Sequence, residues 1–307
     1  MRYLPSTDTT ANIQGGDGFI LKPPKMIILK DLKHIILMKD MLQRELPHSI
    51  SVLGGVMHIL QNNLLHGELC VDSWPTFNTV IYYHQQNRFS SSSCPDIHDM
   101  CTFYTTNPES LRRLLLDKRT INWRSGLTFR DVPAQLRPLI VELASLHGLK
   151  ITERRVYNTF IHQDPENIGK QKEEFPLPVS ILDESHAELV DKHLTYGGSQ
   201  DSINYIRACL RHLPNQCVMN ENGQPVSWML SDELSQLRMA FTLPENRRTG
   251  CFRALTLALV HRMSSMGLPI YCQIHPENEP SINIFTTLGF TACLENISAI
   301  LTCTDSL

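Results

Sequence analysis

The regular pattern of the chain begins after Met26, where apolar residues recur at intervals of three and four, as on one face of a helix. The positions that carry this period are Leu32, Ile35, Ile36 and Leu42. Pro47 ends the predicted helix. The next apolar stretches, "SISVLGGVMHIL" and "GELCVDSWPTFNTVIYYHQ", are expected to be strands, interrupted by Gly54 and Gly55.

Caps and breaks predict the remainder of the first half. In "NPESLRRLLLD", Asn107 is a candidate N-cap and Pro108 takes the first helical position, so a helix is expected. A second helix, "AQLRPLIVELASLHG", is expected to end at Gly148, and "RRVYNTFIH" follows as a strand. Residues 1–25 are expected to be a disordered lead-in, and the serine run 90–93 a loop.

The polar segment "QDPENIGKQKEE", residues 163–174, has the composition of a linker between domains. We therefore expect an N-terminal α/β domain over residues 26–172 and a second domain over residues 173–307.

The pattern after this linker predicts a strand, two helices, three strands, a helix, a strand, a short helix and a terminal hairpin. The segments are "LPVSILD", "ESHAELVDKHL", "QDSINYIRACLRHL", "QCVMNENGQPVSWMLSD", "QLRMAFTL", the helix from about Gly250 to Met266, "PIYCQI", "NEPSINIFTTLG" and "FTACLENISAILTC".

Composition narrows the class of protein. Of the 307 residues 42% are hydrophobic and 19% are charged, and no apolar run is long enough to span a bilayer, which is typical of a soluble globular protein. The net charge of −3 argues against a general nucleic-acid binder. The nine cysteines show no CxxC spacing, so we expect reduced core residues of an intracellular protein. The thirteen histidines form no HExxH or HxxxH pair on a helical pattern, so no metal site is expected.

The stretch "LPENRRTGCFRALTLAL" joins a predicted strand to a predicted helix. The N–H groups and the positive dipole end at the start of a helix attract anions, and a glycine lets the backbone approach a phosphate closely. Arg247 and Arg248, followed by Gly250, add positive charge to this junction. A pair of arginines at a helix start is by itself commonly a solvated surface feature. Here a second motif, "NEPSINIFTTLGF", follows about thirty residues later, and the two motifs together predict a phosphate site at the junction.

These two motifs and the order of elements resemble the GNAT acyltransferase superfamily over roughly residues 175–303. The loop V-x-P-x-x-R-x-x-G-x-G/A is matched by Leu243, Pro244, Arg247 and Gly250, and the motif N-x-x-S-x-x-x-Y-x-x-L-G-F by Asn278, Ser281, Leu288, Gly289 and Phe290. The resemblance implies the α/β (α+β) class, with a mixed, mostly antiparallel sheet flanked by helices. It also implies coenzyme A binding by Leu243, Arg247, Arg248, Thr249, Gly250, Cys251, Phe252, Asn278 and Phe285.

Three further segments resemble the glycine N-acyltransferase branch: "VDSWPTFNTVI", "YGGSQDSINYIRACLRHLP" and "GQPVSWMLSDELSQLRMAFTLPENRR". Together they extend the resemblance to most of the chain from Met26. It implies acyl-CoA as co-substrate, with no tightly bound cofactor, and glycine or a similar amino acid as acceptor. It also implies a mitochondrial address, otherwise a cytoplasmic one, and a monomer without nucleic-acid or membrane partners. Residues 1–25 depart from the family as an extra lead-in.

Amide formation requires that the acceptor ammonium lose a proton, that a donor hold the oxyanion, and that the thiolate depart. In this fold the oxyanion donor is a backbone N–H where the fourth and fifth strands diverge, expected here near residues 241–243. Where the family carries a glutamate this chain has Gln236, and where it carries the acidic tyrosine this chain has Phe285. Asp232 and Glu233 lie within reach of a water relay if the strand bulges; otherwise they are turn residues at a hairpin tip.

Two functions remain open from the sequence. The first is an acyl-CoA:amino acid N-acyltransferase that works mainly by proximity and oxyanion stabilisation. The second is an acyl-CoA-binding protein of the same fold with little turnover, which Gln236 and Phe285 favour.

Overall fold

The computed structural model describes residues 26–84, 99–162, 164, 178–195 and 197–306, without the side chains of 153–155 and 294–298. We call residues 26–162 the first half and residues 178–306 the second half. The lead-in 1–25 and the serine run 90–93 lie outside the described residues. The same holds for the proposed linker 163–174, apart from Asp164, so the domain boundary stays a prediction.

The described residues of the first half form ten helices and strands besides one short 3-10 turn. In chain order they are β1 (Ile27–Leu29), α1 (Leu32–Gln43), α2 (Ile50–Leu60), β2 (Glu68–Val71), β3 (Thr79–His84), β4 (Met100–Thr105), α3 (Pro108–Leu116), β5 (Thr128–Pro133), α4 (Arg137–Leu146) and β6 (Leu149–His162). Asn107 caps α3 as expected, accepting the N–H groups of Glu109 and Ser110. The sequence analysis did not predict β1, β4 or β5.

The second half repeats the order of the first. Its elements are β7 (Val179–Ser180), α5 (Ala187–Lys192), α6 (Gln200–His212), β8 (Asn215–Met219), β9 (Pro225–Ser231), β10 (Gln236–Thr242), α7 (Cys251–Ser265), β11 (Tyr271–Ile274), α8 (Glu279–Thr287) and β12 (Phe290–Asp305). Short 3-10 turns precede α5 and α7. Both halves therefore read β-α-α-β-β-β-α-β-α-β.

The twelve strands of the described residues form one sheet, in the order β1-β2-β3-β4-β5-β12-β6-β11-β10-β9-β8-β7. Two pairs are parallel, β4 with β5 and β10 with β11, and the other pairs are antiparallel. The expected class, a mixed and mostly antiparallel sheet flanked by helices, is confirmed. None of the described helices is long and apolar enough to cross a membrane.

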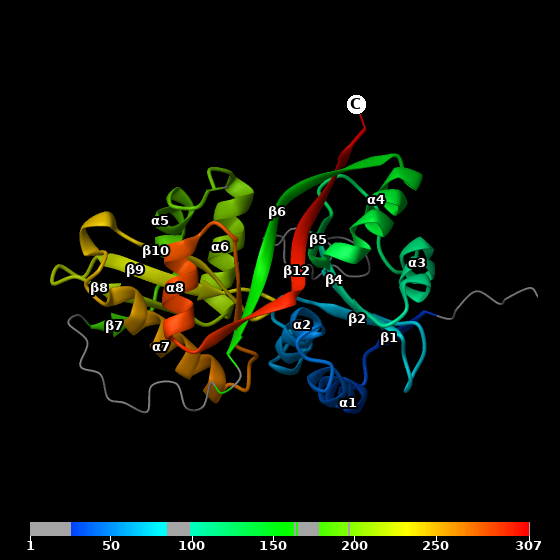
Figure 1. The fold of residues 1–307 in the computed structure, drawn as a ribbon, viewed down its shortest axis with the longest axis horizontal. Coiled ribbons are helices and arrows are strands. Elements are labelled where there is room, and N and C mark those ends of the chain that lie inside the picture. Colours follow the sequence, from blue (N-terminus) through cyan, green and yellow to red (C-terminus); the bar gives the residue numbers. More distant parts are fainter. Residues whose placement is uncertain (1–25, 85–98, 163, 165–177, 196, 307) are drawn as a thin grey trace, which may run out of the picture.

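The two halves exchange their last strands at the centre of the sheet. β6, from the first half, pairs with β11 of the second half, and β12, from the second half, pairs with β5 of the first. β6 and β12 also pair with each other along most of their length, from Phe290 opposite His162 to Asp305 opposite Leu149. Figure 1 shows these two long strands crossing the middle of the molecule side by side.

Helices cover both faces of the sheet in each half (Figure 1). Because neighbouring residues of a strand point to opposite faces, Ile81 of β3 packs with α3 and α4 while Tyr82 packs with α1 and α2. In β9, Trp228 likewise packs with α5 and α6, and Met229 with α7 and α8. The result is a three-layer molecule with four apolar cores.

The segment "SISVLGGVMHIL", expected to be a strand, is the helix α2, so that prediction was wrong. The helix is apolar on nearly all sides because it is buried, and buried helices lack the one-sided pattern that reveals a surface helix. Its glycines permit close contact. A Cβ on Gly54 would lie 1.7 Å from the carbonyl oxygen of Leu234, and one on Gly55 would lie 2.6 Å from the ring of Tyr82.

The terminal hairpin expected over "FTACLENISAILTC" is also wrong, because this segment is the single strand β12. Its register against β6 shifts between Cys293, opposite Thr159, and Ile297, opposite Asn158. The residues between them are absorbed as an irregularity in a continuous strand instead of forming a turn. The long β6 strand supplies the partner that keeps β12 extended.

Candidate functional site

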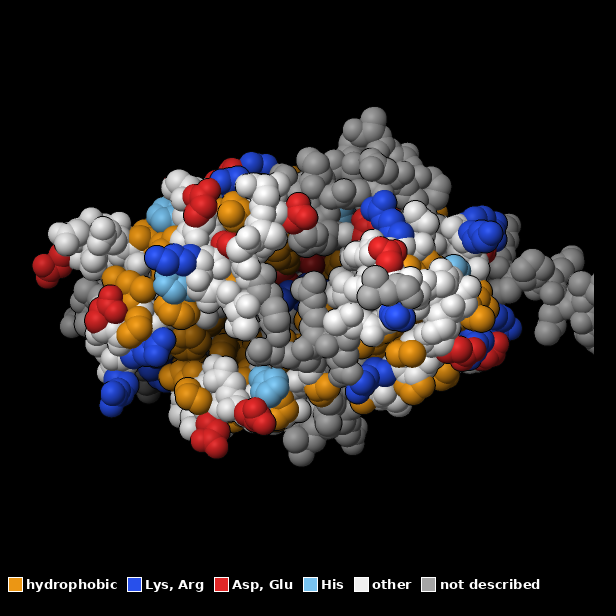
Figure 2. All heavy atoms as spheres, turned by 90° about the horizontal axis from the view of Figure 1, so that it is seen from above, with side chains coloured by type: hydrophobic (Ala, Val, Ile, Leu, Met, Phe, Trp, Pro, Cys, Tyr) orange, Lys and Arg blue, Asp and Glu red, His pale blue; other side chains and the backbone are white. Residues whose placement is uncertain are grey.

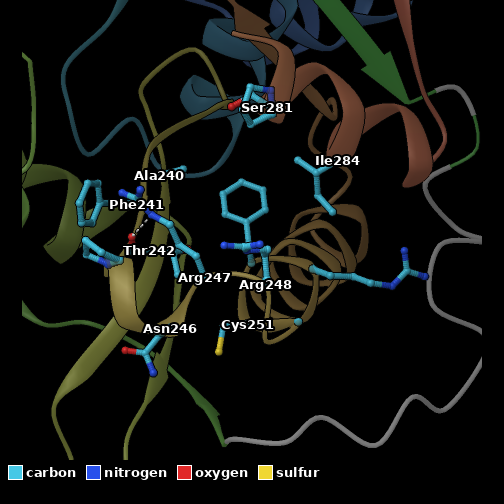
Figure 3. Close-up of a pocket in the computed structure, with 14 residues that line it drawn as sticks. Ala240, Phe241, Thr242, Asn246, Arg247, Arg248, Cys251, Ser281 and Ile284 are labelled. Carbon is cyan, nitrogen blue, oxygen red and sulfur yellow. Dashed lines mark hydrogen bonds between the residues drawn. The ribbon is translucent and has the colours of Figure 1, made fainter.

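A pocket of about 690 Å³ opens where β10 ends and α7 begins. Its walls come from the end of β10, from the loop and first turn of α7, and from α8. The lining residues are Ala240, Phe241, Thr242, Pro244, Asn246, Arg247, Arg248, Gly250, Cys251, Phe252, Arg253, Pro280, Ser281 and Ile284. Figure 3 shows Ala240 and Thr242 across the pocket from Ile284, with Arg247 and Arg248 between them. In Figure 2, hydrophobic side chains gather in a hollow over the second half, with basic side chains beside it.

The pocket lies where two parallel strands separate. β10 and β11 pair only through the first two residues of each strand, at Gln236 and Leu237 in β10. From Arg238 onward β10 pairs with β9 alone, and that ladder is irregular as far as Phe241. The divergence therefore begins earlier than residues 241–243, where we expected it.

The divergence leaves backbone groups of β10 facing the opening. Leu243 donates its N–H to the carbonyl oxygen of Val226 at 2.9 Å, so this group is engaged with β9. N–H directions alternate along a strand, so the N–H of Thr242 points to the other side, toward the opening. Thr242 lines the pocket.

The N-terminus of α7 meets the pocket without a side-chain cap. Its N-cap is Gly250, with φ of 86°, and no described side chain accepts a hydrogen bond from the first N–H groups of the helix. By contrast, Asp31, Asn107 and Ser199 cap α1, α3 and α6 with their side chains. The absence of a capping side chain and the helix dipole make this end of α7 attractive to an anion.

The two expected arginines of the loop behave differently. The Nε of Arg247 donates to the carbonyl oxygen of Thr242 at 3.2 Å, and its guanidinium lies 5.7 Å from the ring centre of Phe241. Arg248 is exposed, with φ of 63°. Thr249 lies outside the pocket lining; its hydroxyl donates to the carbonyl oxygen of Asn246 at 2.6 Å and so holds the loop.

The second sequence motif supports the pocket from behind. Asn278 caps α8 by accepting the N–H of Ser281 at 3.3 Å, and it does not line the pocket. Phe285 is buried, with edge-to-face contacts to Phe252 at 5.9 Å and to Phe290 at 4.9 Å between ring centres. Leu243 packs at the margin of the same core.

Other lining residues were missed by the sequence analysis. Pro280 and Ile284, which were not named, share one face of α8 with the motif residue Ser281, at helical spacings of three and four. A helical projection of the second motif could have identified this face. Asn246 and Ala240 carry no local signal.

The three expected catalytic residues lie together, at the turn between β9 and β10, and they are buried. Arg130 of β5 holds all three. Its Nη1 donates to Glu233 Oε1 at 2.9 Å, and its Nη2 donates to Asp232 Oδ2 and to Gln236 Oε1, both at 2.7 Å. The cluster therefore joins the two halves, and these residues do not line the pocket.

The remaining oxygens of the two carboxylates are also engaged. Asp232 Oδ1 accepts the N–H groups of Leu234 at 3.0 Å and of Gln236 at 2.9 Å, and Arg238 Nη1 lies 3.3 Å from Asp232 Oδ2. Glu233 Oε2 accepts the hydroxyl of Tyr205 at 2.6 Å.

The neighbouring charges keep Asp232 ionised and Arg130 protonated. Burial disfavours the ionised form of Asp232, but Arg130 and Arg238 outweigh it and lower the pKa of Asp232. Burial also opposes the charge on Arg130, yet Asp232 and Glu233 raise its pKa well above the usual value. A fully bonded carboxylate with a lowered pKa is a weak proton acceptor.

Sequence reasoning missed Arg130, which lies about a hundred positions from its partners. The charged pair "RD" within the apolar stretch "LTFRDVP" was an available signal, because a buried charge requires a partner. Asp131, the next residue, accepts a short hydrogen bond from the hydroxyl of Ser51 in α2. Among the described residues, no group of three His, Cys, Asp or Glu could hold a metal ion.

The chain is similar to glycine N-acyltransferases of mammals. That of Homo sapiens is 28% identical over 281 residues, which cover 86% of this chain and 94% of the relative. That of Rattus norvegicus is 28% identical over 277 residues, which cover 82% and 90%. A solved structure of a Drosophila protein has a TM-score of 0.70 at 17% identity, covering 92% of this chain and 99% of that one, which is a likeness of fold.

Two family models cover most of the sequence. The model described as aralkyl acyl-CoA:amino acid N-acyltransferase matches residues 26–214, and the model of its C-terminal region matches residues 216–298. These matches agree with the resemblance noted in the loop and hairpin segments. The chain therefore belongs to the aralkyl acyl-CoA:amino acid N-acyltransferase family.

Proposed function

We propose that the protein transfers an acyl group from acyl-CoA to the amino group of glycine or a similar amino acid. The amine nitrogen attacks the thioester carbon, a C–N bond forms and the C–S bond breaks. The acceptor ammonium gives up two protons overall, one of which neutralises the departing thiolate. The products are an N-acyl amino acid and free CoA.

The pocket at the start of α7 carries the proposal. An uncapped helix N-terminus beside Arg247 and Arg248 suits a pyrophosphate, which brings negative charge and oxygen acceptors. The apolar wall made by Phe252 and Ile284 suits the less polar pantetheine arm. The thioester would then lie in the opening between β10 and β11.

The chemistry would rest mainly on positioning. The N–H of Thr242 is our candidate for the oxyanion donor, since Leu243 donates to β9. Asp232 and Glu233 are already bonded to Arg130, so in our proposal they shape the site, and water takes the proton from the acceptor. Proximity and an oxyanion donor supply several kcal/mol even without a strong base.

One observation favours a second function, an acyl-CoA-binding protein with little turnover. The side-chain oxygen of Gln236 is bonded to Arg130, and the described part of the cluster offers no free carboxylate. Such a protein would bind acyl-CoA in the same pocket but release no CoA when glycine is added.

The two functions separate in an assay of free CoA. A panel of acyl-CoA thioesters, including phenylacetyl-CoA, is incubated with and without glycine. Glycine-dependent release of CoA, with N-acylglycine formed in equal amount, supports the enzyme. Saturable acyl-CoA binding with no release above background supports the binding protein.

The Gln236→Glu variant tests the missing base. We expect the turnover with glycine to stay within about 3-fold of the parent, because position 236 is buried outside the pocket and Arg130 would hold the new carboxylate as a weak base. Acyl-CoA affinity should not change, since the loop at Gly250 is untouched. A rise of about 10²-fold, the low end for general-base catalysis, would instead show that a carboxylate at position 236 reaches the acceptor and that proton removal limits the parent.

By its resemblance to the family we also propose a mitochondrial location and a monomeric state. Import of the full chain into isolated mitochondria tests the first, with cytosolic retention as the contrary result. Light scattering of the purified protein tests the second.

A further inference from the structure

Arg238 lies on β10 at the point where β10 separates from β11. It is the first residue after the last β10–β11 pair, so it stands where the two strands begin to diverge. Ala240 in the pocket wall lies two residues further along the strand, about 7 Å away.

Its side chain lies on the face of the sheet opposite the proposed cofactor loop. Leu237, the preceding residue, packs in the core under α7 and α8. The guanidinium of Arg238 instead contacts Asp232, whose neighbour Glu233 is bonded to Tyr205 of α6. An acceptor that attacks a thioester held between β10 and β11 from the side opposite the cofactor loop would approach Arg238.

Arg238 is the exposed guanidinium of the cluster, and it has donors to spare. Both terminal nitrogens of Arg130 are occupied by Asp232, Glu233 and Gln236. Arg238 makes one longer contact, 3.3 Å to Asp232, and its other nitrogens have no hydrogen-bond partner among the described residues. Its side chain is 32% exposed, whereas that of Arg130 is 6% exposed. Part of the Arg238 side chain is therefore open to solvent.

Arg238 can turn toward an added anion without leaving Asp232 unpaired. The Asp232 carboxylate is shared with Arg130 and keeps its short bond to Arg130 at 2.7 Å if Arg238 turns away. A planar guanidinium matches a carboxylate through two parallel N–H bonds.

We propose that Arg238 binds the carboxylate of the amino-acid acceptor and so selects amino acids over simple amines. The inference rests on the proposed acyl transfer and names the residue that recognises its acceptor. Asp232 holds Arg238 in place until the acceptor's carboxylate binds the unused nitrogens.

The test compares an acceptor with and without a carboxylate. CoA release from phenylacetyl-CoA is measured with glycine and with glycinamide for the parent, Arg238→Gln and Arg238→Lys. We expect Arg238→Gln to raise the KM for glycine by about 10- to 100-fold, as for a lost charge-assisted hydrogen bond, and to change the KM for glycinamide by less than about 3-fold. Arg238→Lys keeps the positive charge but loses the planar guanidinium. Its KM for glycine should therefore lie between that of the parent and that of Arg238→Gln.

Arg207→Gln is the matched control. Arg207 lies on α6 with a side chain 33% exposed and pairs with Glu188 at the surface. It should leave both KM values unchanged, and the KM for phenylacetyl-CoA should stay constant in every variant. Equal losses with glycine and glycinamide, or no loss with glycine, would overturn the inference.

A second readout keeps the inference separate from the proposed function. If the parent releases no CoA with either acceptor, the enzyme proposal fails, and calorimetry then compares the binding of phenylacetylglycine and phenylacetylglycinamide. A selective loss of phenylacetylglycine affinity in Arg238→Gln supports the carboxylate site. No binding by the parent, or equal loss of both compounds, contradicts it.

Discussion

Gly250 is the residue on which the cofactor proposal depends most directly. Its φ of 86° lies in the left-handed region, and a Cβ built on it would meet nothing within 4 Å. A substitution is therefore strained by backbone conformation alone, and an added methyl group would stand where a phosphate approaches the α7 N-terminus.

We predict that Gly250→Ala weakens acyl-CoA binding by about 10-fold or more and lowers the free energy of unfolding by about 1 kcal/mol. Calorimetric titration and denaturant unfolding measure the two effects. Gly223→Ala is the control, because Gly223 has φ of 73° and equally open surroundings outside the pocket. Gly223→Ala should lower the stability without lowering the acyl-CoA affinity. If Gly250→Ala and Gly223→Ala bind acyl-CoA equally well, the loop at Gly250 does not belong to the binding site.

His58 makes stability depend on pH. Burial, together with the nearby His212, His84 and His66, lowers the pKa of His58 from 6.5 to about 4. Its Nε2 accepts the N–H of Leu65 at 3.1 Å, which requires the neutral ring. The unfolded state therefore binds the proton first as the pH falls, so the contribution is complete above pH 6.5 and is lost toward pH 4.

We predict that His58 accounts for about 3 kcal/mol of the stability lost between pH 6.5 and pH 4. His58→Gln, which keeps an acceptor for Leu65, should flatten this part of the pH profile of the unfolding free energy. His261→Gln, at an exposed position, should leave the profile as in the parent. A profile unchanged in His58→Gln would assign the pH dependence to other groups.

At the residue scale, the sequence predicted those site residues that are close neighbours along the chain. Arg247, Arg248 and Gly250 line one pocket because they follow one another in one loop. Arg130 could not be linked to Asp232 in the same way, because only the packing of one half on the other brings them into contact.

At the scale of elements, the turn between β9 and β10 locks the second half onto the first. Its residues Asp232 and Glu233 reach Arg130 of β5, and the carbonyl oxygen of Leu234 accepts the hydroxyl of Tyr271 at 3.0 Å. Gly54 of α2 lies directly against the same carbonyl group. A buried ionic cluster thus depends on a single cation from the other half.

We predict that Arg130→Met lowers the free energy of unfolding by about 3–5 kcal/mol at pH 7, because two buried carboxylates lose their main partner. Without Arg130 their pKa values in the folded state should rise above those of the unfolded state, so the deficit should shrink as the pH falls toward 4. Arg119→Met, which removes an exposed arginine paired with Asp117, should change stability by less than about 1 kcal/mol. A deficit independent of pH would mean that lost packing, not charge, is the cause.

Elements with a local signal were predicted correctly, and those defined by distant partners were not. Asn107 and Pro108 mark the start of α3 within the sequence itself. α2 looks like a strand because tertiary burial removes its polar face, and β12 looks like a hairpin because its long partner β6 is remote in sequence.

At the scale of the whole molecule, the exchange of β6 and β12 makes the halves interdependent. β6 belongs to the first half by sequence but lies between β11 and β12 of the second. A cut in the chain between the halves would therefore break the backbone without separating the sheet.

We predict that a protease site inserted between residues 170 and 171 can be cleaved to give two fragments that stay associated. They should elute together in size-exclusion chromatography and separate only in denaturant. Residues 173–307 expressed alone should fail to give a cooperative unfolding transition, because β11 and β12 lose the partner strand between them. Free, independently folded fragments would contradict the exchange and support two autonomous domains.

The exchange of β6 and β12 also makes the resistance to mechanical unfolding depend on which end of the chain is pulled. β1, at one edge, has three residues and one neighbouring strand, whereas β12, at the centre, has sixteen residues bonded to β5 and β6. Forced unfolding follows the barrier to breaking such contacts. A motor that pulls on the C-terminal end must shear the middle of the sheet at once, while one that pulls from the N-terminal side can peel it strand by strand.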